Sequence, residues 1–467
     1  MSKTGKISFS IMILLIVVSV CAMSFFLRFR QRPSELSPVA DSPAEGASAS
    51  VPASMPSPSP QPVPSGSASI PSLHGPAASP SPEPDAPPEP MPLPPAHELT
   101  ASLAVKLSDG TPAEILLDRS YTTKHVFKPD TSIEIAAPED IYSLYLIWDL
   151  PPGEWALEGD GSQTCGKDGF IHEYIAISSP AQELSILLPP NGATLCSIFA
   201  FSEGSPPDWV QTWQPPWQEA DLLALPTHAD DEHLYFVGVL PYYAGELGYR
   251  VQVAYMTNHW NEPPRPHELL NGLWAVGIRN YPVISGFNDL YVNSFDQAED
   301  LYGFDNFVNY QVELLRRFKP LVVVGHDLDG EYGNGAHMLN ARALLTSVQN
   351  AADSSFHAAS KEQYGVWDTP KLYLHLYPEN AITMDWDVPL ESFGGVTAFE
   401  MAVAGYDCHL SQHHWVFAVP QAGPTGHMFG LARSLVGPDI VGGDMFENIS
   451  GRWHVTIHTA MSMRDDS

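Results

Sequence analysis

Proline is spread so unevenly along the chain that it decides which parts can fold. Of the 45 prolines in 467 residues, 20 lie between Pro33 and Pro95, in a segment made mainly of Pro, Ser and Ala. Such a segment lacks the aromatic and β-branched side chains whose burial would offset the loss of chain entropy. We therefore expect residues 33–97 to form an extended, disordered stalk with polyproline character, and we expect folded domains only in residues 98–467.

An apolar run without charges precedes the stalk. Residues 7–27 contain no Asp, Glu, Lys or Arg, and a helix of about 20 residues is long enough to cross a bilayer core of about 30 Å. The sequence predicts that residues 1–32 contain a membrane anchor or a signal segment, and it leaves open both cleavage and lipidation at Cys21. Arg28, Arg30 and Arg32 favour a cytoplasmic location for the residues after the apolar run. A stalk suits domains that stand clear of a membrane, so we expect a single-pass anchor with the folded domains outside the cell.

Charge limits the classes of partner. The chain has 22 Lys and Arg against 54 Asp and Glu, a formal net charge of −32. This excess repels phosphate backbones and argues against nucleic-acid binding. No Gly-x-Gly-x-x-Gly or Walker motif follows any predicted strand, so we expect no nucleotide cofactor.

Two patterns divide the remaining residues. Residues 98–205 show short alternating apolar runs separated by Pro, Gly and Asp turns, which predicts an all-β sandwich. We expect Trp148 and Trp155 to lie in its core, whereas pairing of Cys165 with Cys196 stays open. In residues 206–467 strands alternate with helices, which predicts a Rossmann-like α/β domain whose mostly parallel sheet carries helices on both faces. The predicted helices include one from Asp231 toward Leu247 and one at Ala398–Asp407. Ligands of such sheets gather beyond the carboxyl ends of the strands.

The first candidate cluster stands where a predicted strand ends and a helix begins. It reads Pro226-Thr-His228-Ala-Asp230-Asp231-Glu232. His228 and Asp231 can converge on one metal ion, while Asp230 remains available as a base, and imidazole with carboxylate suits zinc. The alternative is that the two Asp residues cap a helix and His228 is an ordinary buried histidine.

The second cluster begins at the end of the predicted strand at residues 321–327. It contains His326, Asp327, Asp329, Asn334 and His337. Two clusters of this kind at one sheet edge indicate a metal centre, with Asp327 and Asp329 as candidates for orienting His337. An EF-hand calcium loop does not fit, because its sixth position requires Gly and the residue there is a tyrosine.

These clusters resemble the PIG-L/LmbE-like family of zinc-dependent N-deacetylases. The family's first signature is (A/P)-His-Pro-Asp-Asp-Glu, and its second is close to Gly-Glu-Tyr-Gly-His-x-x-His. The resemblance covers roughly residues 220–467. It implies that the zinc ligands are His228, Asp231 and His337 and that Asp230 is the general base.

Two further elements extend the resemblance. Arg265 and Glu268 stand where the family has an Arg-x-x-Glu element beside the substrate, and residues 406–412, which include His409, resemble its late His-x-Ser-Gln element. Asn334 departs from the pattern, because many members have a second His there. An amide can donate a hydrogen bond to an oxyanion but cannot carry a proton at neutral pH, so His326 or His409 is expected to take over part of that role.

The resulting hypothesis is an exported, membrane-tethered Zn²⁺ hydrolase that removes N-acetyl groups from amino sugars such as N-acetylglucosamine-type glycans or glycoconjugates. The sandwich would hold or present the polymer. The alternative, motivated by Asn334, is a carbohydrate-binding surface protein whose deacetylase-like domain keeps its metal but is weakly active. A zinc amidase acting on an acylated peptide or thiol conjugate is a further alternative. The sequence identifies neither the acceptor sugar nor the oligomeric state.

Overall fold

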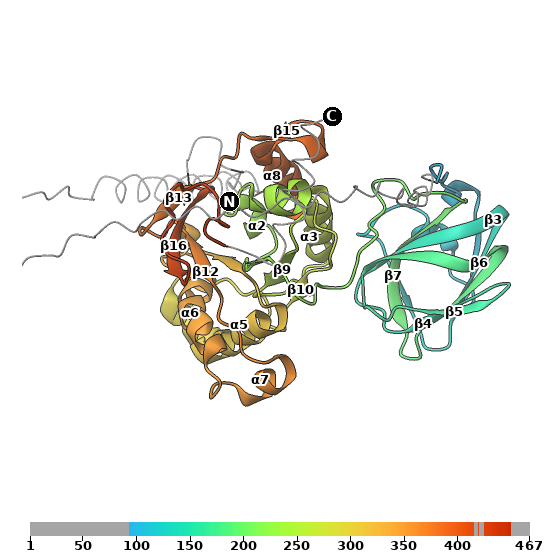
Figure 1. Cartoon of the computed structure of the whole chain (residues 1–467). Coiled ribbons are helices and arrows are strands. Elements are labelled where there is room, and N and C mark those ends of the chain that lie inside the picture. Colours follow the sequence, from blue (N-terminus) through green and yellow to red (C-terminus); the bar gives the residue numbers. More distant parts are fainter. Residues whose placement is uncertain (1–92, 415–418, 420–424, 450–467) are drawn as a thin grey trace, which may run out of the picture. The chain divides into compact units, whose positions relative to one another are not determined.

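A computed structural model describes residues 93–414, 419 and 425–449 of the chain (Figure 1). All described residues belong to one compact unit, as defined by its internal contacts. The predicted membrane segment and nearly all of the predicted stalk lie outside the described residues. Among those that are described, no helix is both long and apolar enough to cross a membrane.

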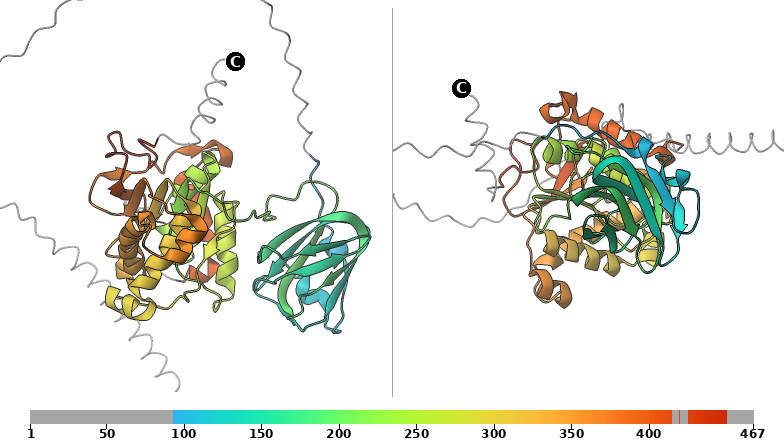
Figure 2. Two further views of the ribbon diagram at one scale, coloured as in Figure 1. Left: turned by 60° about the horizontal axis from the view of Figure 1, so that its bottom comes forward. Right: turned by 90° about the vertical axis from the view of Figure 1, so that its right-hand side faces the viewer.

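The β-rich part is one seven-stranded sheet that folds over on itself (Figure 2). Its main path runs β2-β7-β3-β6-β4-β5, and β1 pairs with β3. The strands are β1 (Ala104–Leu107), β2 (His125–Phe127), β3 (Ser132–Trp148), β4 (Trp155–Glu158), β5 (Ser162–Cys165), β6 (His172–Leu187) and β7 (Ala193–Phe201).

Two long strands allow this folding. The pairing of β3 with β6 shifts register between Ala136 and Ile141 and again before Ser143. Bulges of this kind bend a strand, so the first half of β3 pairs with β1 while its second half pairs with β7. The predicted sandwich is therefore built from a single bent sheet rather than from two separate ones.

The interior of this sheet contains the predicted tryptophans. Trp148 and Trp155 are buried, as expected for core residues, and their indole nitrogens both donate to Glu173. Cys165 and Cys196 are both buried free thiols, so the pairing that the sequence left open is not formed.

The second sheet also has seven strands, in the order β10-β9-β8-β11-β12-β16-β13. The first five are parallel, and β16 is antiparallel to both β12 and β13. Their bounds are β8 (Leu222–Ala224), β9 (Val251–Tyr255), β10 (Val283–Ile284), β11 (Val322–Gly325), β12 (Lys371–His375), β13 (Ala381–Thr383) and β16 (Met428–Ser434). The predicted α/β class with a mostly parallel sheet is confirmed.

Helices cover both faces of this sheet (Figure 1). Successive residues of a strand point to opposite faces, so Leu222 packs in the same core as Leu269 of α3, whereas Leu223 packs with Leu315 of α5. The α-helices are α2 (Asp231–Leu234), α3 (Pro264–Ala275), α4 (Phe295–Tyr302), α5 (Phe304–Phe318), α6 (Gly335–Ala352), α7 (Ala358–Tyr364) and α8 (Ala398–Asp407).

The helix predicted from Asp231 toward Leu247 is the main local difference. In the structure α2 ends at Leu234, and a short π-helical segment (Pro241–Glu246) follows after a turn. Gly238 adopts a positive φ of 83° between the two, which a right-handed helix cannot accommodate.

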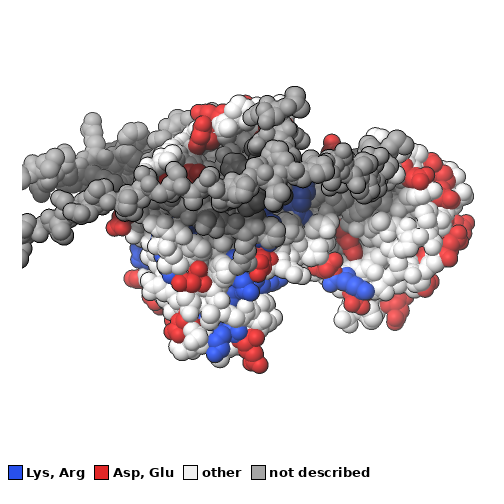
Figure 3. All heavy atoms as spheres, viewed as in Figure 1, with Lys and Arg blue, Asp and Glu red and all other residues white. Residues whose placement is uncertain are grey.

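The acidic excess is visible on the molecular surface. In the view of Figure 3, red carboxylates are spread over the β-rich part with few blue side chains among them. This distribution agrees with the expectation that polyanions are poor partners.

Candidate metal centre and active site

The site lies at the carboxyl ends of three parallel strands, β8, β11 and β12. His228 follows β8 by a few residues, His326 follows β11 directly, and His375 is the last residue of β12. His337 lies in the first turn of α6, which begins after the loop that follows β11. A parallel sheet brings loops far apart in sequence to one edge, and the two sequence clusters meet there.

Three side chains form a compact triangle of potential metal ligands. His228 Nδ1 lies 2.9 Å from His337 Nε2 and 3.2 Å from Asp231 Oδ2. His337 Nε2 lies 3.1 Å from the same oxygen. Ligand atoms bound at about 2.0 to 2.2 Å in a tetrahedron are roughly 3.3 to 3.6 Å apart, so the triangle needs little expansion. Two imidazoles and one carboxylate match the ligand set of open zinc sites.

Glu331 orients three histidines: His337, His326 and His375 of β12. Its Oε2 lies 2.7 Å from His337 Nδ1 and 2.8 Å from His326 Nδ1, and its Oε1 lies 2.7 Å from His375 Nδ1. A carboxylate that accepts from Nδ1–H of His337 leaves Nε2 as the lone pair that faces the triangle. Glu331, rather than Asp327 or Asp329, therefore orients His337.

The electrostatics of the triangle favour a cation. Burial opposes the charged form of His228, but Asp289 and Asp231 outweigh it and raise the pKa of His228 to about 10. Burial likewise opposes ionisation of Asp231, yet His337 and His228 hold the pKa of Asp231 well below its usual range. The carboxylates thus stabilise positive charge at this point, which a divalent metal supplies as well as a proton does.

Asp230 lies beside the triangle in an unusual backbone conformation. Its φ is 118°, and its Oδ1 lies 3.7 Å from Arg265 Nη2, which also donates to the Ala229 carbonyl at 2.7 Å. Burial raises the pKa of Asp230 to about 7, although Arg265 opposes the shift. A carboxylate with such a pKa is suited to exchange protons near neutral pH.

A cavity of about 540 Å³ opens over the triangle. Its lining includes His228, Asp230, Asp231, Arg265, Tyr332 and Asn334. The cavity therefore gives a substrate access to the ligand triangle and to the candidate base together.

Asn334, the departure from the family pattern, caps α6. Its Oδ1 accepts from the backbone N–H groups of Ala336 and His337, and its Nδ2 donates to the hydroxyl of Tyr332 at 3.0 Å. An N-cap fixes the start of a helix, so Asn334 positions His337 and Tyr332. Asn334 also lines the cavity, so its expected contact with a substrate stays a prediction.

His326 and His409 do not occupy the positions expected of proton donors to a substrate. His326 Nε2 accepts from the Thr227 N–H at 2.9 Å and its Nδ1 faces Glu331, so both ring nitrogens are used inside the protein. His409 is fully buried beside His233, with its Nε2 4.0 Å from Glu232, and it is not among the residues that line the cavity. Both rings thus have contacts inside the protein, and their catalytic role stays a prediction.

The two charged residues of the Arg-x-x-Glu element lie in different environments. Arg265 lines the cavity, whereas Glu268 is 1% exposed and accepts from the backbone N–H and hydroxyl of Ser411. Glu268 therefore holds the segment after α8, and its expected contact with a substrate stays a prediction.

Sequence reasoning missed three residues of the site. Asp289 lies 3.3 Å from both His228 Nε2 and His259 Nδ1, Glu331 is the shared acceptor described above, and Tyr332 lines the cavity. Glu331 and Tyr332 stand inside the second motif and were readable from it. Asp289 lies in a loop without a motif, so no local signal marked it.

Comparisons with known proteins give partial matches. No protein-family model matches the chain. A curated relative, the 1D-myo-inositol 2-acetamido-2-deoxy-alpha-D-glucopyranoside deacetylase 1 of Catenulispora acidiphila, is 24% identical over 187 residues, which are 34% of this chain and 57% of that protein. The corresponding deacetylase of Streptomyces scabiei is 25% identical over 187 residues. The chain thus spans little more than half the length of these relatives.

Solved structures resemble parts of the chain. The N,N'-diacetylchitobiose deacetylase of Pyrococcus horikoshii matches with 16% identity and a TM-score of 0.30, over 43% of this chain and 73% of that one. A chitosan-binding module of a Paenibacillus chitosanase/glucanase matches with 13% identity and a TM-score of 0.18, over 23% of this chain and 99% of that one.

Proposed function

The chain belongs to the PIG-L/LmbE-like deacetylase family, and we propose that it is a Zn²⁺-dependent hydrolase that removes the N-acetyl group from an amino sugar in a glycan or glycoconjugate. The ligand triangle of His228, Asp231 and His337 beside Asp230 carries this proposal. The curated relatives are named for deacetylation of an acetamido-deoxy-glucopyranoside, which supports the choice of an acetamido sugar.

In the proposed hydrolysis, some side chains bind the metal and others orient its ligands. His228 Nδ1, His337 Nε2 and Asp231 Oδ2 would hold the metal, and Glu331 and Asp289 would orient the two imidazoles. Bound zinc supplies a Lewis acid for the acetyl carbonyl and lowers the pKa of water toward about 7. The cavity brings the scissile amide to these residues.

Asp230 is the proton carrier of the proposed reaction. It accepts a proton from the attacking water as the new bond to the acetyl carbon forms, and it returns that proton to the nitrogen as the C–N bond breaks. The products are acetate and the free amine. Arg265, through Asp230 Oδ1 and the Ala229 carbonyl, keeps the carboxylate facing the cavity.

Tyr332 is the proposed protein donor to the carbonyl oxygen as negative charge develops on it. Because Asn334 Nδ2 donates to the phenol oxygen, the phenol hydrogen is directed away from Asn334. Tyr332→Phe should lower kcat by about 10² with little change in metal content, the size expected for loss of one oxyanion donor. Tyr291→Phe, at an exposed tyrosine of the same cavity, is the matched control. Wild-type kcat in the Tyr332 variant would assign the donor to another group.

Metal analysis of the purified chain, combined with acetate release from a panel of N-acetylated amino-sugar glycans, glycoconjugates and acylated peptides, tests the proposed function. Stoichiometric zinc with release from an amino sugar supports it. Release only from acylated peptides would contradict the substrate class, and metal without any acetate release would favour a carbohydrate-binding role.

We also propose that the catalytic domain is exported and tethered by residues 7–27, on the strength of the uncharged apolar run and the Pro-rich segment after it. Protease added to intact cells whose outer layers admit it should digest the catalytic domain. Full protection of that domain under the same conditions, with digestion after lysis, would contradict export.

A further inference from the structure

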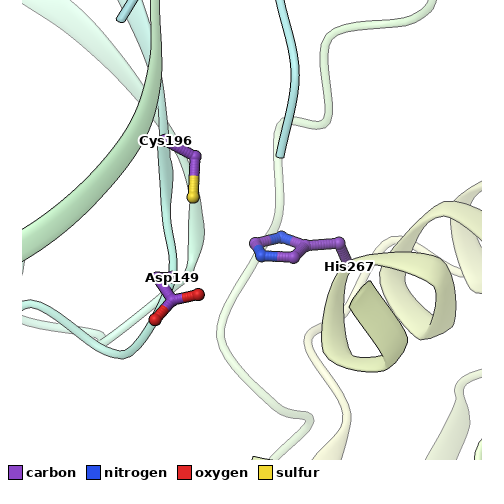
Figure 4. A group of neighbouring side chains, drawn as sticks. All are labelled: Asp149, Cys196 and His267. Carbon is purple, nitrogen blue, oxygen red and sulfur yellow. The ribbon is translucent and has the colours of Figure 1, made fainter. Parts of the chain in front are cut away.

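A second group of metal-ligating side chains lies away from the catalytic triangle. Cys196 of β7 and Asp149, just after β3, come from the β-rich part, and His267 comes from α3 of the α/β part (Figure 4). One ligand atom of each lies within 4.8 Å of the other two. Cys196 and His267 are both 0% exposed.

A chain of hydrogen bonds defines which nitrogen of His267 carries a proton. An indole N–H can only donate, so the Gln211 atom that lies 2.8 Å from Trp213 Nε1 is the amide oxygen. The same oxygen lies 2.9 Å from His172 Nδ1. His172 must therefore donate from Nδ1, and its Nε2 has the lone pair.

The hydrogen bond between His172 and His267 leaves Nε2 of His267 available to bind a metal. His267 Nδ1 lies 3.0 Å from His172 Nε2 and must donate to it. Burial lowers the pKa of His267 to about 4, so the ring is neutral and Nε2 has no proton. Among the described residues this buried Nε2 has no hydrogen-bond partner, and Figure 4 shows the ring directed toward Cys196 and Asp149.

We propose that Cys196 Sγ, His267 Nε2 and the Asp149 carboxylate bind a second divalent metal ion of the zinc class. A histidine whose other nitrogen is fixed by a hydrogen bond is the usual form of such a ligand. In a tetrahedral zinc site with these donors the ligand atoms are roughly 3.3 to 3.8 Å apart, so closing the group requires each atom to move by about 1 Å or less. A water molecule completes the coordination.

Binding at this site displaces one proton. Burial and the nearby Asp149 raise the pKa of the Cys196 thiol to about 12, so the metal-free protein holds a thiol and the metal replaces its proton, which passes to solvent. Lys124 Nζ lies 2.9 Å from each oxygen of Asp149. Each carboxylate oxygen has a second lone pair, so Asp149 can bind a metal while it keeps Lys124.

The site would fasten the β-rich part to the helix that serves the catalytic cavity. His267 and Arg265 are two residues apart near the start of α3, and Arg265 reaches the Ala229 carbonyl and Asp230. A metal that joins β7 to His267 therefore steadies the segment that presents Arg265. Its role is structural, and it is separate from hydrolysis.

Cobalt substitution distinguishes this site from the catalytic one, because the catalytic triangle contains no sulfur. The purified full chain and its His337→Ala variant are stripped of metal under reducing conditions and titrated with Co²⁺. We expect a thiolate-to-cobalt charge-transfer band in the near ultraviolet, saturating at one equivalent in His337→Ala. The band should disappear in Cys196→Ser and in the double variant, and Asp149→Asn should weaken cobalt binding at this site at least tenfold.

Cys165→Ser is the matched control, because Cys165 is also a buried free thiol of the β-rich part, and this variant should keep the full band. Circular dichroism checks that each variant is folded. Folded wild-type protein without a thiolate band, or a band that persists in Cys196→Ser, would overturn the proposal whatever the catalytic site binds. If Cys196→Ser does not fold, an alkylation experiment replaces that variant. Zn²⁺ should protect Cys196 of the His337→Ala variant from alkylation, and a thiol that is not protected overturns the proposal.

Discussion

Asp230→Asn should lower acetate release by about two to four orders of magnitude, which is the usual contribution of a general acid or base. The amide cannot accept the proton of water, whereas its size and its tolerance of a positive φ preserve the turn at 118°. Metal content and the thermal unfolding midpoint should therefore stay close to wild type. Steady-state acetate release and metal analysis of the same preparation measure both.

The pH profile gives an independent readout of the same residue. Because the base acts when deprotonated, wild-type kcat/KM should fall as the pH drops through the pKa of Asp230, which burial raises to about 7 and a bound dication lowers. That acidic limb should be absent from the residual activity of Asp230→Asn. Glu262→Gln, a half-exposed carboxylate of the same cavity, should change turnover by no more than a few-fold. Wild-type turnover in Asp230→Asn would contradict the assignment of the base.

His337→Ala should abolish tight metal binding at the catalytic triangle and, with it, acetate release. It removes one of three ligands whose donor atoms lie 2.9 to 3.2 Å apart and leaves only His228 and Asp231. Metal analysis after dialysis and competition with a chromogenic chelator measure the loss. Unchanged catalytic-site affinity in this variant would show that His337 is not a ligand.

Glu331→Gln should lower metal affinity less than His337→Ala does. It retains all three ligands but replaces the carboxylate that accepts from His337 Nδ1, so metal affinity should fall about 10- to 100-fold, as found for partners of ligating histidines. A loss as complete as that of His337→Ala would mean that Glu331 holds the loop fold rather than the orientation of one ring.

Local periodicity was enough to locate most elements of the α/β part. The helix predicted at Ala398–Asp407 is α8 with the same bounds, and the strand predicted at residues 321–327 contains β11. Buried strands and amphipathic helices leave their period in the chain itself, so these elements are readable. The helix expected beyond Leu234 was lost because Gly238 interrupts it with a positive φ, and residue periodicity alone does not report a backbone angle.

The candidate site residues also include some that the sequence indicated and others whose role needed the structure. His228 and Asp231 were nominated because they follow a predicted strand, and parallel strands place such positions at one edge of a sheet. His337 was assigned as the third ligand by the family resemblance. Glu331 was passed over in favour of Asp327 and Asp329, although it belongs to the same motif. Which carboxylate faces His337 depends on the turn of the Glu331–Gly333 segment, which places Tyr332 at a φ of 46°.

By itself, then, the sequence determined the α/β class and the small set of side chains from which a metal centre can be built, because composition and period are properties of the chain read locally. Only the tertiary structure decided what each side chain does. It made Asn334 a helix cap, turned Glu268 to Ser411, buried His409, and brought Asp289 to His228 and Cys196 toward His267. The physical reason is that side-chain roles depend on contacts between segments distant in sequence, and those contacts exist only once both sheets have packed.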